Sequence, residues 1–328
     1  MNTKKIIIMI GLGICGVIIL SVVYMVFFGK NQLQEESVFV VGKNQTELEI
    51  IDKMKKQELI KNKTIFVVTL YLRGKHHAIA PGGYKMQKNM TMWHVINKIT
   101  SPPDMKWVVI REGLRKEQIG ELLADTFGWS EEDVDKWNTV YTKMEIDYLE
   151  GTYFPDTYLI PVDEDGLAVA KRMIRRFNEQ FEPYIGQFAE QNIKWTTGLT
   201  MASIIQREAG GKDDMPLIAG ILWNRLKQDM NLEIDATVQY ARGKTEEGWW
   251  APITPEDITR IDSPYNTYMY KGLPPHPISN PGVDAIDAVL HPTETECLYY
   301  LHDRDREIHC AKTYEEHKEN IEKYLQRL

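Results

Sequence analysis

The hydrophobic pattern begins with one uninterrupted apolar segment. Ile6 to Phe28 carries no charged residue, and at ~1.5 Å per residue it is long enough to cross a hydrocarbon layer of ~30 Å. A cleaved signal peptide has a shorter apolar region and a small-residue cleavage site, and the sequence GKNQLQEES that follows Phe28 contains no such site. We therefore predict a transmembrane helix over 6–28, with a short tail before it (1–5) and a linker after it (29–37).

Charges on either side of this segment predict its orientation. Lys4 and Lys5 precede it, whereas Glu35 and Glu36 follow it. Positive charge is retained on the cytoplasmic side of a membrane. The sequence therefore predicts a single-pass protein of the plasma membrane, with a cytoplasmic N-terminus and with everything after the helix outside the cytoplasm.

The next part of the chain alternates strand and helix patterns. Apolar β-branched and aromatic residues predict strands, spacings of three and four predict helices, and Pro-Gly-Gly predicts a turn. The expected elements are strands at 37–41, 64–72 and 105–110, helices within 44–60 and 89–100, and a turn at 80–84. They predict a small α+β domain over 38–112.

Two amphipathic helices follow, at 115–128 and 130–141, and we assign them to a connector over 113–148. Ser130 and Asp133 have the spacing of a helix-capping box. Near Leu149 the composition changes to aromatic residues, prolines and turns, and a long helix follows at 167–185. We therefore expect a mixed α/β domain over 149–328, and an α+β fold for the chain as a whole.

The charge balance limits the choice of partner. The chain has 47 acidic and 39 basic residues and a net charge of -8, which argues against nucleic acid because such binding requires Lys and Arg to neutralise phosphates. Of the three cysteines, Cys15 lies in the apolar segment. Cys297 and Cys310 flank a predicted hairpin that turns near 303–305, where they fall on opposing strands but not opposite each other, so a disulfide is compatible with the pattern and not required by it.

One carboxylate stands at the end of a predicted helix. Leu199, Ala202 and Ile205 share a helical stripe that stops at Gly210, where we expect a left-handed residue to end the helix. Glu208 then lies in the last turn, where the helix dipole disfavours its charged form and raises its pKa. A carboxyl that stays protonated near neutral pH can serve as a general acid. The alternative is a solvated Glu208 that pairs with Arg207 or Lys212.

Three polar and aromatic stretches surround this position in the sequence: 231–241, 263–282 and 290–301. The second holds five prolines and three tyrosines, a stiff surface of the kind that stacks on sugar rings, although such residues also occur in ordinary cores. The chain has no G-x-S-x-G elbow, no Walker loop and no H-E-x-x-H helix. Its histidines are scattered, so we expect neither a metal site nor a cofactor.

The ordered motifs ASIIQREAG, ILWNRL, LEIDATVQYA, SPYNTYMYKGLPPHPISNPG and KTYEEHKENIEKYL, after LEGTYFPDTYLIP, strongly resemble those of the endolytic murein transglycosylases, the YceG-like family. The resemblance covers the whole chain and implies a membrane anchor, a small LysM-like domain and a catalytic domain. It also implies cleavage of nascent peptidoglycan glycan strands at the outer face of the membrane, and it places the catalytic glutamate at Glu208.

The chain departs from the family pattern at three places. The family usually has E-K-E where this chain has Gln206-Arg207-Glu208, D-P-T where Ala236 stands between Asp235 and Thr237, and glycine where this chain has His276. Gln206 is not an acid, so Glu208 is the remaining candidate in that motif. His276 affects the expected substrate preference, because a side chain now occupies a place where a backbone approached closely.

The resemblance implies a mechanism with one carboxylate, in which Glu208 serves as acid and then as base and leaves a 1,6-anhydro end. Release of the strand would terminate its elongation, and peptidoglycan synthases would be partners. Candidates for orienting the sugar are Asn224, Asp235, Thr237, Tyr240, Tyr265, Asn266 and Tyr268. Two alternatives remain open: a hydrolase that uses Asp235 as a second carboxylate, and a non-catalytic glycan-binding scaffold of a wall-synthesis complex.

Overall fold

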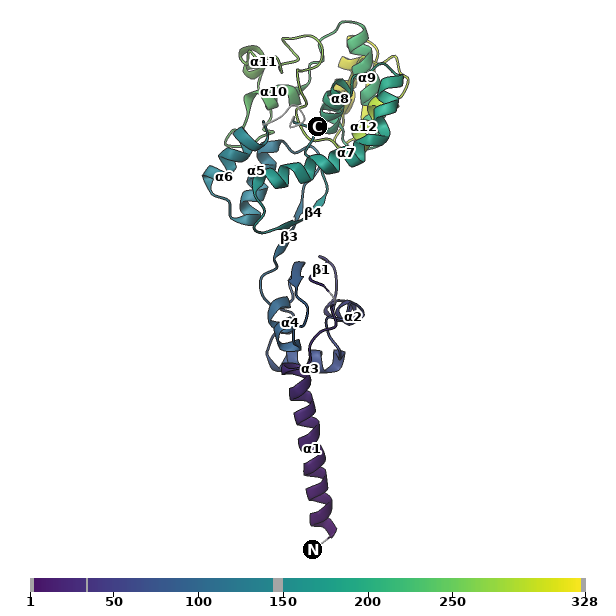
Figure 1. The fold of residues 1–328 in the computed structure, drawn as a ribbon. Helices are drawn as coiled ribbons and strands as arrows, with labels where there is room; N and C mark the ends of the chain where they lie inside the picture. Colours follow the sequence, from purple (N-terminus) through teal and green to yellow (C-terminus); the bar gives the residue numbers. More distant parts are fainter. Residues whose placement is uncertain (1–2, 34, 144–149, 326–328) are drawn as a thin grey trace. The chain divides into compact units, whose positions relative to one another are not determined.

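The chain forms two compact units. The structure is a computed structural model that describes residues 3–33, 35–143 and 150–325. One unit comprises Met1–Val108 and Tyr158–Glu164, and the other comprises Val109–Thr157 and Asp165–Leu328 (Figure 1). The predicted boundary at Leu149 lies outside the described residues. The described part of the predicted connector belongs to the second unit.

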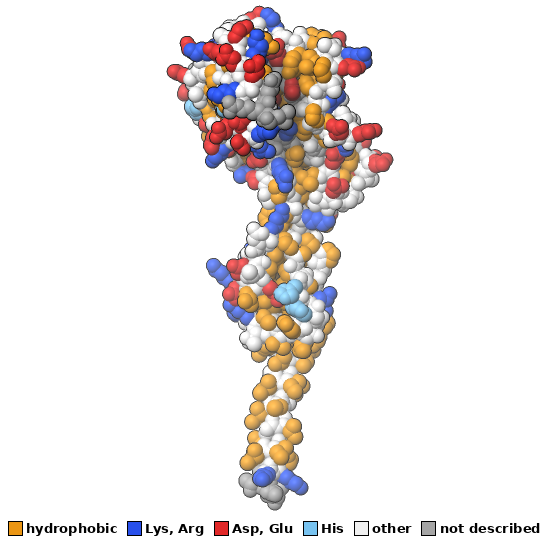
Figure 2. Space-filling view, turned by 180° about the vertical axis from the view of Figure 1, so that it is seen from behind, with side chains coloured by type: hydrophobic (Ala, Val, Ile, Leu, Met, Phe, Trp, Pro, Cys, Tyr) orange, Lys and Arg blue, Asp and Glu red, His pale blue; other side chains and the backbone are white. Residues whose placement is uncertain are grey.

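The first unit begins with the apolar helix α1, Thr3–Phe27. Its segment Lys4–Phe27 is long and apolar enough to cross a membrane, and none of its most apolar stretch is buried within the protein. Figure 2 shows hydrophobic side chains covering this helix. The prediction of a helix over 6–28 is therefore confirmed as far as the element itself is concerned.

The globular part of the first unit contains a four-stranded sheet. Its strands are β1 (Ser37–Val41), β2 (Gly82–Met86), β3 (Met105–Val109) and β4 (Thr157–Pro161), in the spatial order β1-β2-β3-β4. β1 and β2 are antiparallel, from Ser37 opposite Met86 to Val41 opposite Gly82. β4 is distant from the other strands in sequence, so the chain leaves this unit after β3 and returns once to complete its sheet.

Three helices complete this core: α2 (Glu47–Lys56), α3 (Lys63–Leu72) and α4 (Met92–Ile99). Thr46 and Glu49 form a capping box at the start of α2. The predicted apolar face of α4 is buried, and it packs with residues of the sheet and the other helices in one hydrophobic cluster. The strand at 37–41 and the helices within 44–60 and 89–100 are thus confirmed.

Two predictions in this unit are wrong. The segment 64–72 was expected to be a strand, but it forms most of α3, because Asn62 caps the backbone N–H of Ile65 at 3.0 Å and Phe66 and Leu70 are buried at a helical spacing of four. The intrinsic strand preference of Val, Thr and Ile is overridden by packing. The segment 80–84 was expected to be a turn, but its last three residues begin β2.

The second unit is mainly helical. Its elements are α5 (Lys116–Phe127), α6 (Glu131–Lys136) continued by a π-helical turn η1 (Trp137–Tyr141), α7 (Gly166–Glu190), α8 (Trp195–Glu208), α9 (Met215–Lys227), α10 (Asp235–Arg242), α11 (Pro255–Arg260), α12 (Val283–Leu290), β5 (Tyr299–His302), β6 (Ile308–Ala311) and α13 (Tyr314–Tyr324). The capping box predicted at Ser130 is present at the start of α6. Helices α5, α6 and α7 agree with the predicted helical segments.

Close backbone packing holds α8 and α9 in the core. A Cβ added at Gly198 of α8 would lie 2.2 Å from the Phe188 ring, and one added at Gly220 of α9 would lie 2.2 Å from the carbonyl oxygen of Thr293. Both distances are far below any real contact, so only glycine allows these approaches. The result is that α8 is buried from Gly198 to Ile205, and its last turn, Gln206 to Glu208, is only partly buried.

The strands β5 and β6 form the hairpin that the sequence predicted. Tyr300 lies opposite Cys310, and Cys297 and Cys310 form a disulfide with their Cα atoms 5.9 Å apart. The sequence left this bond open, and the structure contains it. The disulfide closes the base of the hairpin on which Tyr300 and His302 stand.

Candidate active site

Glu208 is the last residue of α8, at the point where the helix leaves the core. The helix ends at Ala209 in an extended conformation, so the expected left-handed residue at Gly210 is absent. The turn is held instead by Asp214, whose two carboxylate oxygens accept the backbone N–H groups of Gly210 at 2.9 Å and Gly211 at 3.3 Å. Asp214 therefore holds the turn after the helix, where a left-handed glycine had been expected.

The Glu208 carboxyl has a buried environment and one specific partner. The hydroxyl of Tyr300 donates a hydrogen bond to its Oε2 at 2.7 Å. Burial raises the pKa of Glu208, the Tyr300 hydrogen bond opposes that rise, and the charge of Asp235 adds to it. The direction agrees with the sequence prediction, but its main cause is desolvation rather than the helix dipole.

His302 extends this arrangement to the turn. Its Nε2 lies 2.7 Å from an oxygen of Asp214, the same residue that holds Gly210 and Gly211. Tyr300 and His302 are two residues apart on β5, so their side chains leave the same face of the strand. The strand β5 therefore positions Tyr300 against Glu208 and His302 against Asp214, which holds the turn after Glu208.

One alternative predicted that Glu208 pairs directly with Arg207, but the Arg207 guanidinium makes its contacts elsewhere. Its guanidinium lies 4.0 Å from the centre of the Trp250 ring, and its Nη1 reaches the carbonyl oxygen of Gly113 at 3.5 Å. Burial lowers the pKa of Arg207, and the Glu208 charge opposes this. The positive charge therefore acts on Glu208 through space.

Asp235 and Tyr268 approach the same region from a second direction. Asp235 is the exposed first residue of α10 and accepts a hydrogen bond from the Tyr268 hydroxyl at 2.5 Å. Burial raises the pKa of Tyr268, and both Asp235 and Glu208 raise it further by their negative charge. The two carboxylates therefore act on one tyrosine, and the sequence-predicted Glu208, Asp235 and Tyr268 come together in the structure.

Three other sequence candidates make their hydrogen bonds within the protein. Asn224 donates to the carbonyl oxygens of Thr295 and Cys297. Thr237 is buried and shares a hydrogen bond of 2.8 Å with Thr267. Asn266 is fully buried and donates to two carbonyl groups at the end of α11, those of residues 258 and 261. These side chains fix the loops that carry Asp235, Tyr268 and the hairpin.

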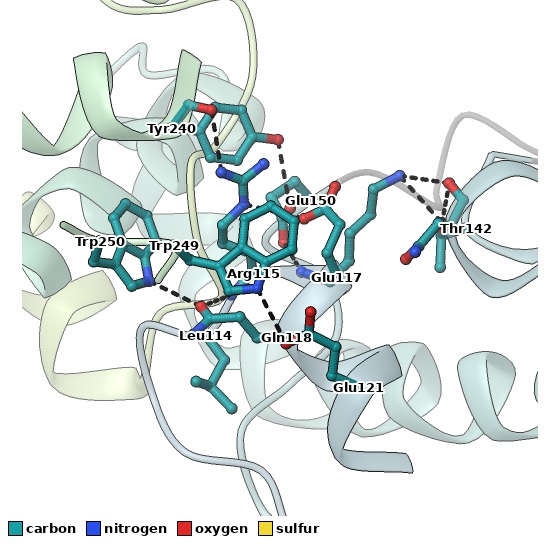
Figure 3. A network of polar contacts seen from close by, with 12 residues as sticks. Leu114, Arg115, Glu117, Gln118, Glu121, Thr142, Glu150, Tyr240, Trp249 and Trp250 are labelled. Atoms are coloured by element: carbon teal, nitrogen blue, oxygen red, sulfur yellow. Dashed lines mark hydrogen bonds and ion pairs between the residues drawn. The ribbon is translucent and has the colours of Figure 1, made fainter. Parts of the chain in front are cut away.

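Tyr240 belongs to a second polar cluster (Figure 3), and Tyr265 packs against it. Their rings lie 4.9 Å apart, and the Arg115 guanidinium lies 4.1 Å from the Tyr240 ring and 4.6 Å from the Trp249 ring. The Tyr240 hydroxyl points to Glu150 at 3.4 Å. This cluster ties α10 to the start of α5.

Glu150 is the buried acid of that cluster. Its carboxylate accepts the backbone N–H of Lys116 at 3.0 Å and the side-chain amide of Asn280 at 2.8 Å. Burial raises the pKa of Glu150 to about 8, and the neighbouring Glu117 adds to the rise while Arg115 opposes it. The sequence pattern did not single out this residue, because nothing in the local sequence shows that Glu150 is buried.

Comparison with known proteins identifies the family. The YceG-like family profile matches residues 39–323, which is most of the chain. The chain belongs to the YceG-like family.

Two relatives of this YceG-like chain share the same name. A Bacillus subtilis protein named endolytic murein transglycosylase is 33% identical over 294 residues, covering 83% of this chain and 80% of the relative. A Streptococcus pneumoniae protein of the same name is 27% identical over 84% of this chain, and the match spans 56% of that longer protein. A crystal structure of a YceG-like protein from Listeria monocytogenes covers 88% of this chain and 99% of its own, with 27% identity and a TM-score of 0.59.

The sequence analysis did not single out three residues of the candidate site: Tyr300, His302 and Asp214. Tyr300 lay within a stretch singled out for its polar and aromatic residues, at 290–301, but no local pattern indicated its contact with Glu208. Asp214 follows the Gly-Gly turn at a spacing that allows it to accept both N–H groups. That spacing was the one available signal.

One group of potential metal ligands occurs among the described residues. Oxygen or nitrogen atoms of Asp303, Glu307 and His309 lie within 4.8 Å of one another at the turn of the β5–β6 hairpin. Asp303 already accepts the backbone N–H groups of Asp305 and Glu307 at 2.9 Å each and contacts His309 at 2.8 Å. This group stabilises the hairpin turn through those hydrogen bonds.

Proposed function

We propose that this YceG-like chain is an endolytic murein transglycosylase that cleaves glycan strands of peptidoglycan with Glu208 as its single proton-transfer group. The observation that carries the proposal is a half-buried carboxyl with a raised pKa, held by Tyr300 at 2.7 Å beside an exposed second acid, Asp235. The name shared by the relatives, together with 33% identity to one of them, supports the same reaction.

The proposed reaction needs one carboxyl in two successive roles. Protonated Glu208 donates its proton to the glycosidic oxygen as the bond from C1 of N-acetylmuramic acid breaks. The C6 hydroxyl of the same sugar then attacks C1, and the Glu208 carboxylate takes the hydroxyl proton. The products are a free hydroxyl on the departing strand and a 1,6-anhydro end, with Glu208 protonated again. Because the nucleophile belongs to the substrate, the protein need not position a water molecule.

The neighbours of Glu208 suit these two roles. Desolvation and the charge of Asp235 raise the pKa of Glu208 and so favour the protonated carboxyl before the reaction. The Tyr300 hydroxyl and the positive charge of Arg207 stabilise the carboxylate that forms after the first proton transfer. We propose that Asp235 and Tyr268 also orient the sugar.

Direct sugar contacts by Asn224, Thr237, Tyr240, Tyr265 and Asn266 stay a prediction. The hydrogen bonds of Asn224, Thr237 and Asn266 support an indirect contribution, in which these side chains hold the loops of the site in place. Tyr240 and Tyr265 expose part of a paired aromatic surface, which suits the apolar face of a sugar ring.

A second candidate reaction is hydrolysis with Asp235 as a partner carboxylate. It is favoured by the charge interaction between Asp235 and Glu208, since glycosidases generally pair two acids. The non-catalytic scaffold, which the sequence left open, has less support, because the relatives are named for a catalytic activity. It requires no proton transfer, so it predicts no new chain ends.

We further propose that α1 anchors the chain in the plasma membrane with its N-terminus in the cytoplasm. Lys4 and Lys5 before the helix support this orientation. The first unit, whose core begins with the order β1-α2-α3-β2, would act as a LysM-like module that binds the glycan strand. Cleavage of nascent strands there would terminate their elongation, with peptidoglycan synthases as partners.

The test is mass analysis of products from uncrosslinked glycan strands treated with the full-length protein. Glu208→Gln should lower turnover by at least ~10² to 10⁴, because one group serves both proton transfers. Asp235→Asn should retain turnover and anhydro ends. Glu190→Gln is the matched control, since Glu190 is also the last residue of a helix but is exposed.

Each alternative has its own outcome in this experiment. Products heavier by one water, lost equally in both acid variants, would establish the hydrolase. Unchanged glycan with the wild-type protein, together with binding that survives Glu208→Gln, would establish the scaffold.

A further inference from the structure

The outward side of α3 is apolar and is not covered by the rest of the unit. Phe66 and Leu70 face the core, whereas Val68, Tyr71 and Leu72 are 50%, 67% and 84% exposed. These three residues lie at helical spacings of three and four, so they form one stripe. A soluble surface rarely collects large apolar side chains at this exposure, and such patches mark contact with a partner or a membrane.

This stripe lies next to the end of the predicted membrane helix. α3 and α4 both pack against α1, and the chain after α1 is tied to the same unit, because Asn31 donates its backbone N–H to the carbonyl oxygen of Met90 at 2.7 Å. Figure 1 shows α3 at the end of the globular part where α1 joins it, and Figure 2 shows hydrophobic side chains continuing from α1 onto that end. The stripe is therefore at the level where α1 would leave a bilayer.

Aromatic and basic groups surround this end. The Trp93 ring lies 5.1 Å from Phe27 of α1 and 4.0 Å from the Arg73 guanidinium. The Nη1 of Arg73 is buried and has no hydrogen-bond partner among the described residues. Tryptophan, tyrosine and arginine side chains are typical of the headgroup layer of a membrane, where the rings lie at the boundary and the cation meets lipid phosphate.

A cavity opens beside the same helices. It has a volume of about 210 Å³ and is lined by apolar side chains of Met25, Leu59 and Met92 and by polar groups of Lys30, Asn31 and Lys61. Asn31 is only 7% exposed. Its Nδ2 donates to the carbonyl oxygen of Gln87 at 2.9 Å, but its Oδ1 is buried without a partner. An unsatisfied buried acceptor beside two lysines suits a group that carries both hydroxyls and negative charge.

We propose that the base face, defined as Val68, Tyr71, Leu72 and Arg73 with the adjoining cavity, rests in the headgroup layer of the membrane. The occupant is the phospholipid bilayer itself, with a headgroup seated in the cavity and its phosphate near Lys30 and Lys61. The first unit is then held against the membrane by α3 as well as by α1. This proposal rests on the proposed membrane anchor, and α3 takes the role of an interfacial helix.

The test places a fluorescent nitrobenzoxadiazole label at single cysteines of the full-length protein in vesicles of phosphatidylcholine and phosphatidylglycerol. Native Cys15 reports on α1, because it is the one free cysteine among the described residues. Leu72→Cys, with Cys15→Ser, reports on the base face. Leu48→Cys, also with Cys15→Ser, is the matched control, since Leu48 is 72% exposed on α2 of the same unit.

Lipids that carry a quencher on their acyl chains then measure the depth of each label. We expect the label at 72 to be quenched from a depth of about 5 to 10 Å below the headgroups, and the label at 48 to be quenched no more than a label in water. A quenched label at 15 with unquenched labels at 72 and 48 would overturn the base face while leaving the anchor intact. An unquenched label at 15 would overturn the anchor, and the base face with it.

Discussion

Removal of the Tyr300 hydroxyl tests how the proposed acid is tuned. In the structure this hydroxyl donates to Glu208 at 2.7 Å and favours the charged carboxylate. Tyr300→Phe keeps the ring and deletes that hydrogen bond. The pKa of Glu208 should therefore rise further above its ordinary value.

The magnitude follows from the hydrogen bond. A bond to a charged group contributes about 1.5 to 3 kcal/mol, and 1.36 kcal/mol corresponds to one pKa unit. Water and the protonated form of Glu208 recover part of this energy in Tyr300→Phe, so we expect the pKa of Glu208 to rise by about one unit. A general acid acts while protonated, so activity is present below the Glu208 pKa and is lost as pH rises through it. The alkaline limb should move upward by about one pH unit.

The assay is the pH dependence of kcat/KM on uncrosslinked glycan. The plateau at lower pH should stay within about tenfold of wild type, because Tyr300 tunes the acid and transfers no proton itself. Tyr299→Phe is the control, since this neighbouring side chain instead stacks against His317, with 5.5 Å between ring centres. An alkaline limb that stays in place or moves downward in Tyr300→Phe would refute the reasoning, as would an equal shift in Tyr299→Phe.

Three further predictions concern stability, each measured by chemical denaturation. The folded-state pKa of Glu150, about 8, lies above its unfolded value, so the free energy of unfolding should fall as pH rises from about 4.5 towards 8, at up to ~1.4 kcal/mol per pH unit. Glu150→Gln should flatten this slope. An unchanged slope would contradict the raised pKa of Glu150. The Cys297–Cys310 disulfide closes a loop with a sequence separation of 13, so replacing both cysteines with serine should lower the free energy of unfolding by about 3 kcal/mol. An equal denaturation midpoint with and without reductant would show that the bond contributes nothing to stability. Gly220→Ala should cost at least about 1 to 3 kcal/mol, because the new Cβ would lie 2.2 Å from the Thr293 carbonyl oxygen; wild-type stability would show that the backbone relaxes.

Local sequence patterns were sufficient to predict an element where its own apolar residues already identify the element and its buried face. The uncharged run at 6–28 predicted α1, and the spacing of Met92, Val95 and Ile99 predicted α4 with its buried face. The same kind of reasoning failed at 64–72, where β-branched residues favoured a strand. There the choice depended on how Phe66 and Leu70 enter the core, which is a property of the whole unit rather than of the segment.

Glu208 shows the same division within the site. Its place at the end of a helix, beside a Gly-Gly turn, was determined by the local sequence, whereas its pKa is raised mainly by burial. Its burial, and its contact with Tyr300 across 92 residues of chain, depend on where β5 is placed by the disulfide and by the packing of α9 against Thr293. Periodicity reports which residues share a face of one element, but a contact between distant elements exists only once both are packed in the same core, and that is what the tertiary structure decided.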